Sequence, residues 1–394
     1  MRVVAALAFV VVVAAVAGLA GCSSSTSSGS GPAGSPTPVV SAPAPLSDDE
    51  IVNGDFPEPS EYANVGNGTT QGLAATNVNV AFTASGNKRT VLYATPKGDP
   101  PADGWPVILE YFFVLPETNP VDYFTITTID ECSSSGDSFD CGYRLRNIMY
   151  KQLLDAGFAI VSMGTWQGDI SWNSWFFSPD PNDKLKTCCC STECASAEQA
   201  REDCEAYWPG TDEAFLGPLF DDMHDGKYGK LDMANVALGG YSAGAQAVSR
   251  AINNYPSMTT PAGNEFPGIR SAMMLSGGSY FCYGDATVSW CKNPIGCCPQ
   301  NQTEQIYDDG QRPWSEHPPV ILAQTTNDDY ADTNASVYYF DVLKSHDVPT
   351  ELVRQDLDAS VCEKFYGKTG KCETHTFFPK MINPVVDFYV RFAT

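Results

Sequence analysis

The pentapeptide Gly-Tyr-Ser-Ala-Gly at residues 240–244 constrains the fold of this chain more than any other stretch, because it fits the pattern Gly-x-Ser-x-Gly. Asn235–Gly239 before it predicts a buried strand, and Ala245–Asn254 after it predicts a helix with one apolar face. On a sharp strand-to-helix turn, the serine is strained and its hydroxyl stands above the sheet edge. A Cβ at either glycine would collide with the neighbouring strand and helix. A plain glycine turn is the alternative interpretation.

Strands and helices are predicted to alternate along most of the chain. Near-continuous apolar runs indicate strands covered on both faces, and amphipathic patterns indicate helices between them. The other predicted strands are Asn77–Thr83, Arg89–Ala94, Pro106–Val114, Phe158–Met163, Ser271–Ser276, Val320–Gln324 and Glu351–Arg354. The other predicted helices are Cys141–Asp155, Asn334–Ser345 and one around Pro384–Phe392. This order predicts an α/β fold with a mostly parallel, doubly wound sheet, helices on both faces and two antiparallel strands at its start.

The first 50 residues are predicted to precede the folded domain, which we expect over residues 51–394. Residues 1–21 have one arginine, an apolar run and then small residues, so they predict a signal peptide and a location outside the cytoplasm. Residues 19–22, Leu-Ala-Gly-Cys, resemble a bacterial lipobox, in which Cys22 would carry a lipid and tether the protein to a membrane. Cleavage near Ala20 without lipidation is the alternative. Residues 22–50, rich in Ser, Gly and Pro, predict a flexible tether.

Charge and cysteine content restrict the possible partners. The formal net charge of −24 argues against binding to nucleic acid or to anionic lipid head groups. Fourteen cysteines in an exported chain point to disulfides, and Cys132–Cys141, Cys282–Cys291 and Cys362–Cys372 are close enough to form local loops. A zinc site among residues 188–194 is the less favoured reading. No metal and no cofactor are expected, and we expect a monomer.

Two long segments, residues 165–219 and 279–317, interrupt the alternation of strands and helices. Both are rich in tryptophan and cysteine, and loops of this length in a compact domain are usually lids or binding loops. They predict a disulfide-rich cap; disulfide-braced surface decoration is the alternative. Trp166 and Trp172 follow a predicted strand, so they are candidates for stacking on a substrate, as is Tyr241 beside the serine. The tryptophans could equally form the core of the insertion.

A serine hydroxyl is a poor nucleophile and needs an adjacent base that a third group orients. The chain has four histidines. His375 is favoured as the base, because it follows the last predicted strand and precedes the C-terminal helix. The others are disfavoured by position: His224 in an acidic loop, His317 before a strand at the wrong sheet edge, and His346 at a helix end.

The orienting acid is expected just past the end of the strand Val320–Gln324, at the edge where the serine lies. Asp328 is the first choice for this position, and Asp332 and Asp329 are the alternatives. At least two of the three must be turn or helix-capping residues.

With these residues, the chain resembles the α/β-hydrolase superfamily, in its secreted esterase and polyester-depolymerase-like branches. The resemblance rests on Gly240–Gly244 and on the order Ser242, Asp328, His375, and it covers roughly residues 89–394. It implies an extracytoplasmic serine hydrolase that cleaves a small-molecule or polymeric carboxylic ester through an acyl-enzyme. A peptidase or acyltransferase with the same triad and a catalytically silent binding protein are the alternatives.

The resemblance also implies an oxyanion hole, but the sequence departs from the family here. Family members often carry glycine after the strand that corresponds to residues 107–111, whereas this chain has Phe112-Phe113-Val114. The backbone N–H of Ala243 is the expected first donor, because it follows the nucleophile, and that of Phe113 the expected second. The departure puts in doubt the room for a bulky acyl group.

Overall fold

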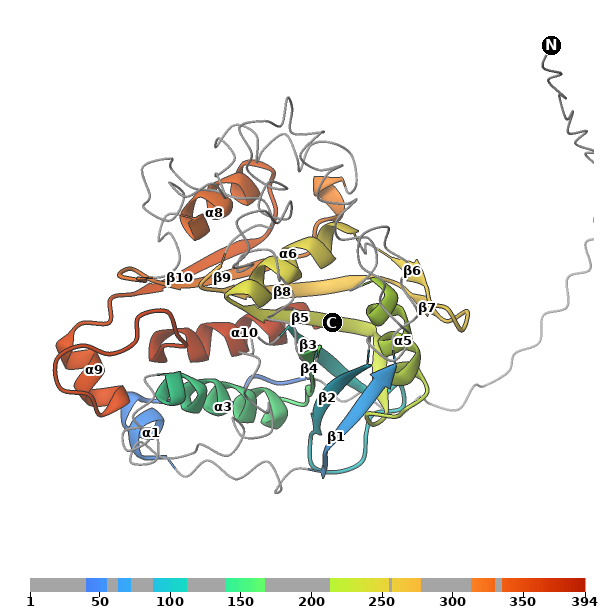
Figure 1. Ribbon diagram of the computed structural model, residues 1–394, viewed down its shortest axis with the longest axis horizontal. Helices are drawn as coiled ribbons and strands as arrows, with labels where there is room; N and C mark the ends of the chain where they lie inside the picture. Colours follow the sequence, from blue (N-terminus) through green and yellow to red (C-terminus); the bar gives the residue numbers. More distant parts are fainter. Residues whose placement is uncertain are drawn as a thin grey trace, which may run out of the picture. The chain divides into compact units, whose positions relative to one another are not determined.

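The computed structural model describes residues 40–54, 63–71, 88–111, 139–166, 213–254, 257–277, 313–329 and 335–393, all within one compact unit, residues 38–394 (Figure 1). Its centre is an eight-stranded sheet in the order β1-β2-β4-β3-β5-β8-β9-β10. The strands are β1 (Ala63–Gln71), β2 (Lys88–Thr95), β3 (Trp105–Tyr111), β4 (Ala159–Trp166), β5 (Leu231–Tyr241), β8 (Ile269–Leu275), β9 (Val320–Thr325) and β10 (Thr350–Gln355). A short hairpin of β6 (Met258–Thr259) and β7 (Glu265–Phe266) forms a separate two-stranded sheet.

One strand of the main sheet runs against the others. β2 is antiparallel to both of its neighbours, β1 and β4, and every pair from β4 to β10 is parallel. The carboxyl ends of the parallel strands therefore meet at one edge of the sheet, where ligands bind in folds of this kind.

Helices cover both faces of the sheet. The helices are α1 (Asp48–Asn53), α3 (Phe139–Asp155), α5 (Glu213–His224), α6 (Ala243–Asn254), α8 (Ala335–Ser345), α9 (Ala359–Tyr366) and α10 (Ile382–Phe392). Residues of α3, α9 and α10 pack in one hydrophobic core, and residues of α5, α6 and α8 in another. In Figure 1, α3 and α10 lie below the central strands and α6 and α8 above them.

The central sheet separates the two cores, and alternate side chains of its strands contribute to one core or the other. On β3, Ile108 packs with the α3 and α10 core, whereas Val107 and Leu109 pack with the α6 core. On β9, Ile321 and Leu322 divide in the same way. Successive side chains point to opposite faces, so a strand covered on both faces must be apolar throughout. A mostly parallel, doubly wound sheet with helices on both faces confirms the expected α/β-hydrolase fold.

The structure adds elements that the sequence did not predict. β1 is an edge strand that no prediction covered, and its second half, from Asn67 to Gln71, is polar and contains a glycine. α5 begins inside the first predicted insertion and packs Phe215, Leu219 and Phe220 into the core. α1 begins at Asp48, inside the predicted tether, with Ser47 as its N-cap in a capping box.

Several expectations fall outside the described residues. They are the signal peptide, Cys22, the strand Asn77–Thr83, and most of the two predicted insertions, residues 167–212 and 279–312. Within the described residues, no helix is long and apolar enough to cross a membrane.

A buried carboxyl group in the central sheet gives a pH-dependent prediction. Glu110 on β3 is 1% exposed; Ser162 donates to its Oε2 at 3.1 Å, and its Oε1 has no hydrogen-bond partner among the described residues. Burial raises the pKa of the Glu110 carboxyl above its ordinary value of 4.5, although the charge of Arg146 opposes the rise. A raised folded-state pKa means that the folded protein holds this proton more tightly than the unfolded chain does.

We therefore expect Glu110 to favour folding below about pH 4.5 and to lose that contribution as the pH rises toward its folded-state pKa. In Glu110→Gln this titration is absent, so the free energy of unfolding of the variant should improve relative to wild type as the pH rises from 4.5 to 7. Urea unfolding of both proteins across this range measures the difference. A difference that stays constant with pH would contradict the prediction.

Candidate active site

Ser242 lies on a sharp turn between β5 and α6. β5 ends at Tyr241, α6 begins at Ala243, and Ser242 between them has φ +55°, a left-handed conformation that non-glycine residues rarely adopt. Such strain persists only where the surrounding structure imposes it, and it is typical of functional sites.

This turn packs so closely against neighbouring backbone that only glycine fits two residues to either side of Ser242. A Cβ on Gly244 would lie 2.0 Å from the carbonyl oxygen of Tyr111 on β3, and one on Gly240 would lie 2.3 Å from the carbonyl oxygen of Gly244. The backbone N–H of Ser242 donates to the carbonyl of Leu275 at the end of β8, at 2.8 Å. The two glycines thus let α6 sit directly against β3 and β5, which fixes the direction of the serine.

Three side chains distant in sequence meet at this turn. The Nε2 atom of His375 lies 2.8 Å from the Oγ of Ser242, and its Nδ1 lies 3.0 and 2.9 Å from the two carboxylate oxygens of Asp328. The side chain of Asp328 is fully buried and that of His375 is 10% exposed, while Ser242 is partly exposed. Because the ring lies between the two groups, its Nδ1–H donates to Asp328 and its Nε2 can accept the serine proton.

The elements that carry the acid and the base are braced around this contact. Asp328 follows the end of β9, and His375 lies in the segment between α9 and α10. A disulfide joins Cys362 in α9 to Cys372, three residues before His375. Cys141 is also disulfide-bonded, but its expected partner, Cys132, lies outside the described residues.

The remaining histidines and the alternative acid lie elsewhere. His317 is buried before β9, and its Nδ1 donates to the carbonyl of Pro318 at 2.8 Å. His224 ends α5 with its side chain half exposed, and the ring of His346 stacks on Trp314. Asp329 is exposed, and Asp332 lies outside the described residues.

Tyr241 does not occupy the position expected of a substrate contact. It is 1% exposed, because its side chain points into the core shared with α3 and α10 rather than toward the sheet edge. Its hydroxyl donates to the backbone carbonyl of His375. The proximity of Tyr241 to Ser242 in sequence was therefore misleading, since neighbouring residues at a strand end point in different directions.

Of the remaining residues predicted to donate to the oxyanion or to contact the substrate, two lie within the described part of the chain and two do not. Ala243 is the first residue of α6, so its backbone N–H belongs to the unpaired first turn of that helix. Trp166 is the last residue of β4. Phe113 and Trp172 lie outside the described residues.

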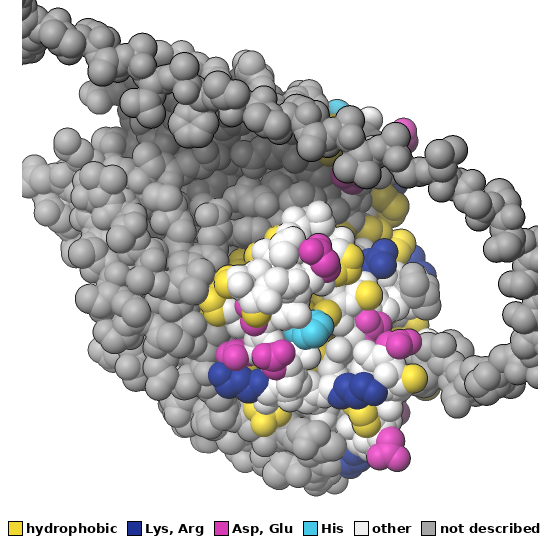
Figure 2. Space-filling model, turned by 90° about the vertical axis from the view of Figure 1, so that its right-hand side faces the viewer, with side chains coloured by type: hydrophobic (Ala, Val, Ile, Leu, Met, Phe, Trp, Pro, Cys, Tyr) yellow, Lys and Arg dark blue, Asp and Glu magenta, His cyan; other side chains and the backbone are white. Residues whose placement is uncertain are grey.

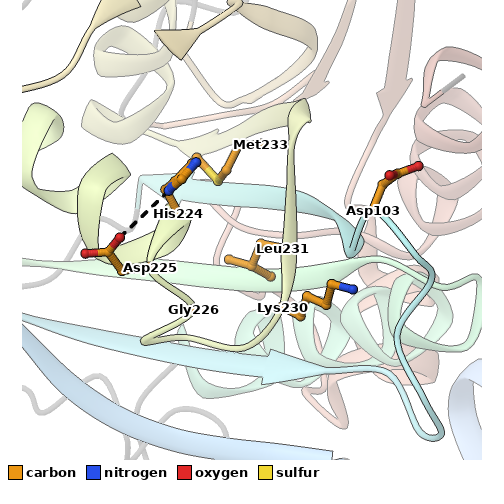
Figure 3. Close-up of a pocket in the computed structure, with 7 residues that line it drawn as sticks. All are labelled: Asp103, His224, Asp225, Gly226, Lys230, Leu231 and Met233. Carbon is orange, nitrogen blue, oxygen red and sulfur yellow. Dashed lines mark ion pairs between the residues drawn. The ribbon is translucent and has the colours of Figure 1, made fainter. Parts of the chain in front are cut away.

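A surface pocket with a volume of about 520 Å³ lies at the opposite end of β5. Lys230, Leu231 and Met233 line it from the start of that strand, while Ser242 follows the strand's end (Figure 3). His224 and Asp225, 3.8 Å apart, form one side of it. The described part of the face in Figure 2 intersperses acidic, basic and apolar side chains. The described residues contain no group of three His, Cys, Asp or Glu side chains that could hold a metal ion.

The fold and this constellation define the chain as an α/β-hydrolase-fold protein. No family model matches it. It is 24% identical to a poly(3-hydroxyoctanoate) depolymerase of Pseudomonas fluorescens over 292 residues, which cover 72% of this chain and 77% of that protein. This likeness confirms the resemblance to the depolymerase-like branch and, at a coarse level, supports a hydrolase.

Solved structures show more distant likenesses. An esterase of Thermogutta terrifontis matches with a TM-score of 0.37 and 10% identity, covering 86% of this chain and 95% of the esterase. The acylaminoacyl peptidase of Pyrococcus horikoshii matches with a TM-score of 0.40 and 11% identity, covering 84% of this chain. The chain spans 42% of the length of that peptidase.

Proposed function

We propose that this protein is an extracytoplasmic serine hydrolase that cleaves carboxylic esters, with Ser242 as nucleophile, His375 as general base and acid, and Asp328 as the orienting carboxylate. The observation that carries the proposal is the continuous contact from Ser242 Oγ through the His375 ring to Asp328. Nucleophile, base and orienting group within hydrogen-bond reach of one another are the geometric signature of an activated serine.

The proposed reaction begins with attack of Ser242 Oγ on the ester carbonyl while the Nε2 atom of His375 takes the hydroxyl proton. The buried carboxylate of Asp328 keeps the proton of the imidazole on Nδ1 and stabilises the imidazolium that forms. His375 then gives its proton to the leaving alcohol, which departs as the acyl-enzyme forms. The same ring next removes a proton from water as the water oxygen attacks the acyl carbonyl. It then returns this proton to Ser242 Oγ as the bond between that oxygen and the acyl carbon breaks, which releases the carboxylic acid and restores the serine.

The negative oxygen of the tetrahedral intermediate needs donors that are already in place. We assign the first to the backbone N–H of Ala243, because it opens α6 and the helix dipole favours negative charge there. The N–H of Ser242 is already donated to Leu275, so it does not compete for this role. Phe113 remains the proposed second donor.

We propose a small-molecule or polymeric ester as the substrate, without a cofactor. The likeness to a poly(3-hydroxyoctanoate) depolymerase supports an aliphatic ester, because that relative spans most of this chain. The proposed location outside the cytoplasm depends on the signal-like residues 1–21, and a membrane tether would depend on Cys22.

The proposal is tested by treating the purified protein with a fluorophosphonate probe and locating the label by peptide mass spectrometry. We expect one stoichiometric label on the peptide that contains Ser242, and hydrolysis of p-nitrophenyl esters. A series of esters of increasing acyl length would then size the acyl pocket, and matched anilides would distinguish a peptidase. A folded protein that neither takes the label nor hydrolyses any ester would favour a silent binding protein.

A further inference from the structure

The two backbone carbonyls on either side of the His375 Cα each accept a hydrogen bond from a buried hydroxyl. The carbonyl of Thr374, before His375, accepts from Oγ1 of Thr325. The carbonyl of His375 itself accepts from the hydroxyl of Tyr241. Thr325 is fully buried and Tyr241 is 1% exposed, so neither bond competes with solvent.

The two donors come from the strands that carry the other two members of the constellation. Thr325 is the last residue of β9, three residues before Asp328. Tyr241 is the last residue of β5, directly before Ser242. One hydroxyl therefore fixes the backbone of His375 relative to the acid, and the other fixes it relative to the nucleophile.

Further contacts strengthen both attachments. The backbone N–H of Asp329, the residue after Asp328, donates to Oγ1 of Thr374, the residue before His375, at 3.1 Å. This is a second hydrogen bond between the end of β9 with its following loop and the segment that carries His375. The ring of Tyr241 packs against the rings of His375 and Phe377, with centroids 5.2 Å apart in both pairs. The position of the imidazole is thus held in two ways: by hydrogen bonds to the backbone on both sides of His375, and by packing of the Tyr241 ring against the imidazole.

We propose that Tyr241 and Thr325 are positioning residues that hold the imidazole of His375 at its working distances from Ser242 and Asp328. The proposal rests on the proposed function. A ring that must accept a proton on one side and donate on the other tolerates little displacement, because a misplacement of about 1 Å can cost on the order of 10²-fold in rate. Preformed bonds to rigid strands prevent that displacement without reorganisation during the reaction.

The test compares kcat and KM for a p-nitrophenyl ester in Tyr241→Phe and Thr325→Val, each of which removes one hydroxyl and nearly preserves volume. We expect kcat to fall roughly 10- to 100-fold in each variant with little change in KM, because the change affects the reacting groups and not substrate binding. Thr325→Ser keeps the hydroxyl and should restore most of the wild-type kcat.

Tyr366→Phe is the matched control. Tyr366 is also fully buried, and its hydroxyl donates at 2.7 Å to the carbonyl of Phe377, two residues beyond His375. Its loss removes the same kind of bond from the same segment, so we expect a similar fall in thermal stability with kcat near the wild-type value.

An equal loss of kcat in Tyr366→Phe and Tyr241→Phe would overturn the inference, because it would indicate general destabilisation. So would an unchanged kcat in both Tyr241→Phe and Thr325→Val, or a Thr325→Ser variant as slow as Thr325→Val. Ser242→Ala in the same assay tests the proposed function separately: turnover that survives this change, or a wild type without turnover, contradicts that function rather than the positioning alone.

Discussion

Replacement of Ser242 by alanine is expected to reduce kcat for ester hydrolysis by about 10⁶-fold, the loss seen when the nucleophile of a serine hydrolase is removed. The Oγ atom is the only atom lost, and it is the atom proposed to attack the carbonyl. With His375 left in place, the remaining rate would come from substrate binding and the oxyanion donors alone. Steady-state hydrolysis of a p-nitrophenyl ester measures the loss.

The thermal stability of Ser242→Ala is the control, because it shows whether the variant is still folded. Alanine at position 242 meets the same left-handed backbone strain as serine at φ +55°, so the thermal unfolding midpoint should stay close to that of the wild type. Substantial hydrolysis by a well-folded Ser242→Ala protein would show that another residue is the nucleophile, and would refute the proposed mechanism.

The second large effect is expected from Asp328→Asn, with a fall in kcat of about 10⁴-fold. The two carboxylate oxygens of Asp328 lie at 3.0 and 2.9 Å from Nδ1 of His375, where they accept its proton. An amide at this position can present its NH₂ group to Nδ1, which favours the wrong tautomer and places the proton on the nitrogen that must accept one from Ser242.

Asp329→Asn is the matched control for the acid. Asp329 is adjacent in sequence and exposed, and the same change of one carboxylate to an amide should leave kcat within about twofold of wild type, as expected for a surface substitution. If the losses were reversed, with Asp329→Asn inactive and Asp328→Asn active, the assignment of the acid would be wrong.

The parts of the fold that sequence reasoning recovered are those with strong apolar periodicity. β3, β9 and the second half of β5, residues 236–241, are buried and form near-continuous apolar runs, whereas the partly exposed start of β5 at residues 232–234 was not predicted. β1 has neighbours on one side only, and its polar residues give no such pattern. α5 contains Gly217 and Pro218, and both residues argue against a helix in a sequence, although packing of its apolar face overrides them here.

The residues of the candidate site also fall into two groups, those that the sequence predicted and those that it did not. The spacing in Gly-x-Ser-x-Gly and the scarcity of histidine pointed to Ser242 and His375, which the structure places 2.8 Å apart. Thr325 and the hydroxyl of Tyr241 carry no comparable signal, because a threonine at a strand end and a buried tyrosine are common in any domain. Their relation to His375 depends on tertiary contacts that span 49 and 134 residues, and no local pattern encodes it.

The contact between Ser242 and His375 also spans 133 residues, which orders events during synthesis of the chain. At a translation rate of about 5–20 residues per second, the serine is made roughly 7 to 27 seconds before the histidine. During that interval its hydroxyl lacks its proposed base, and we expect it to be as unreactive as that of any surface serine. A nascent chain in which the turn at Ser242 has already formed would therefore stay chemically inert until the segment after α9 has been made and has packed in place.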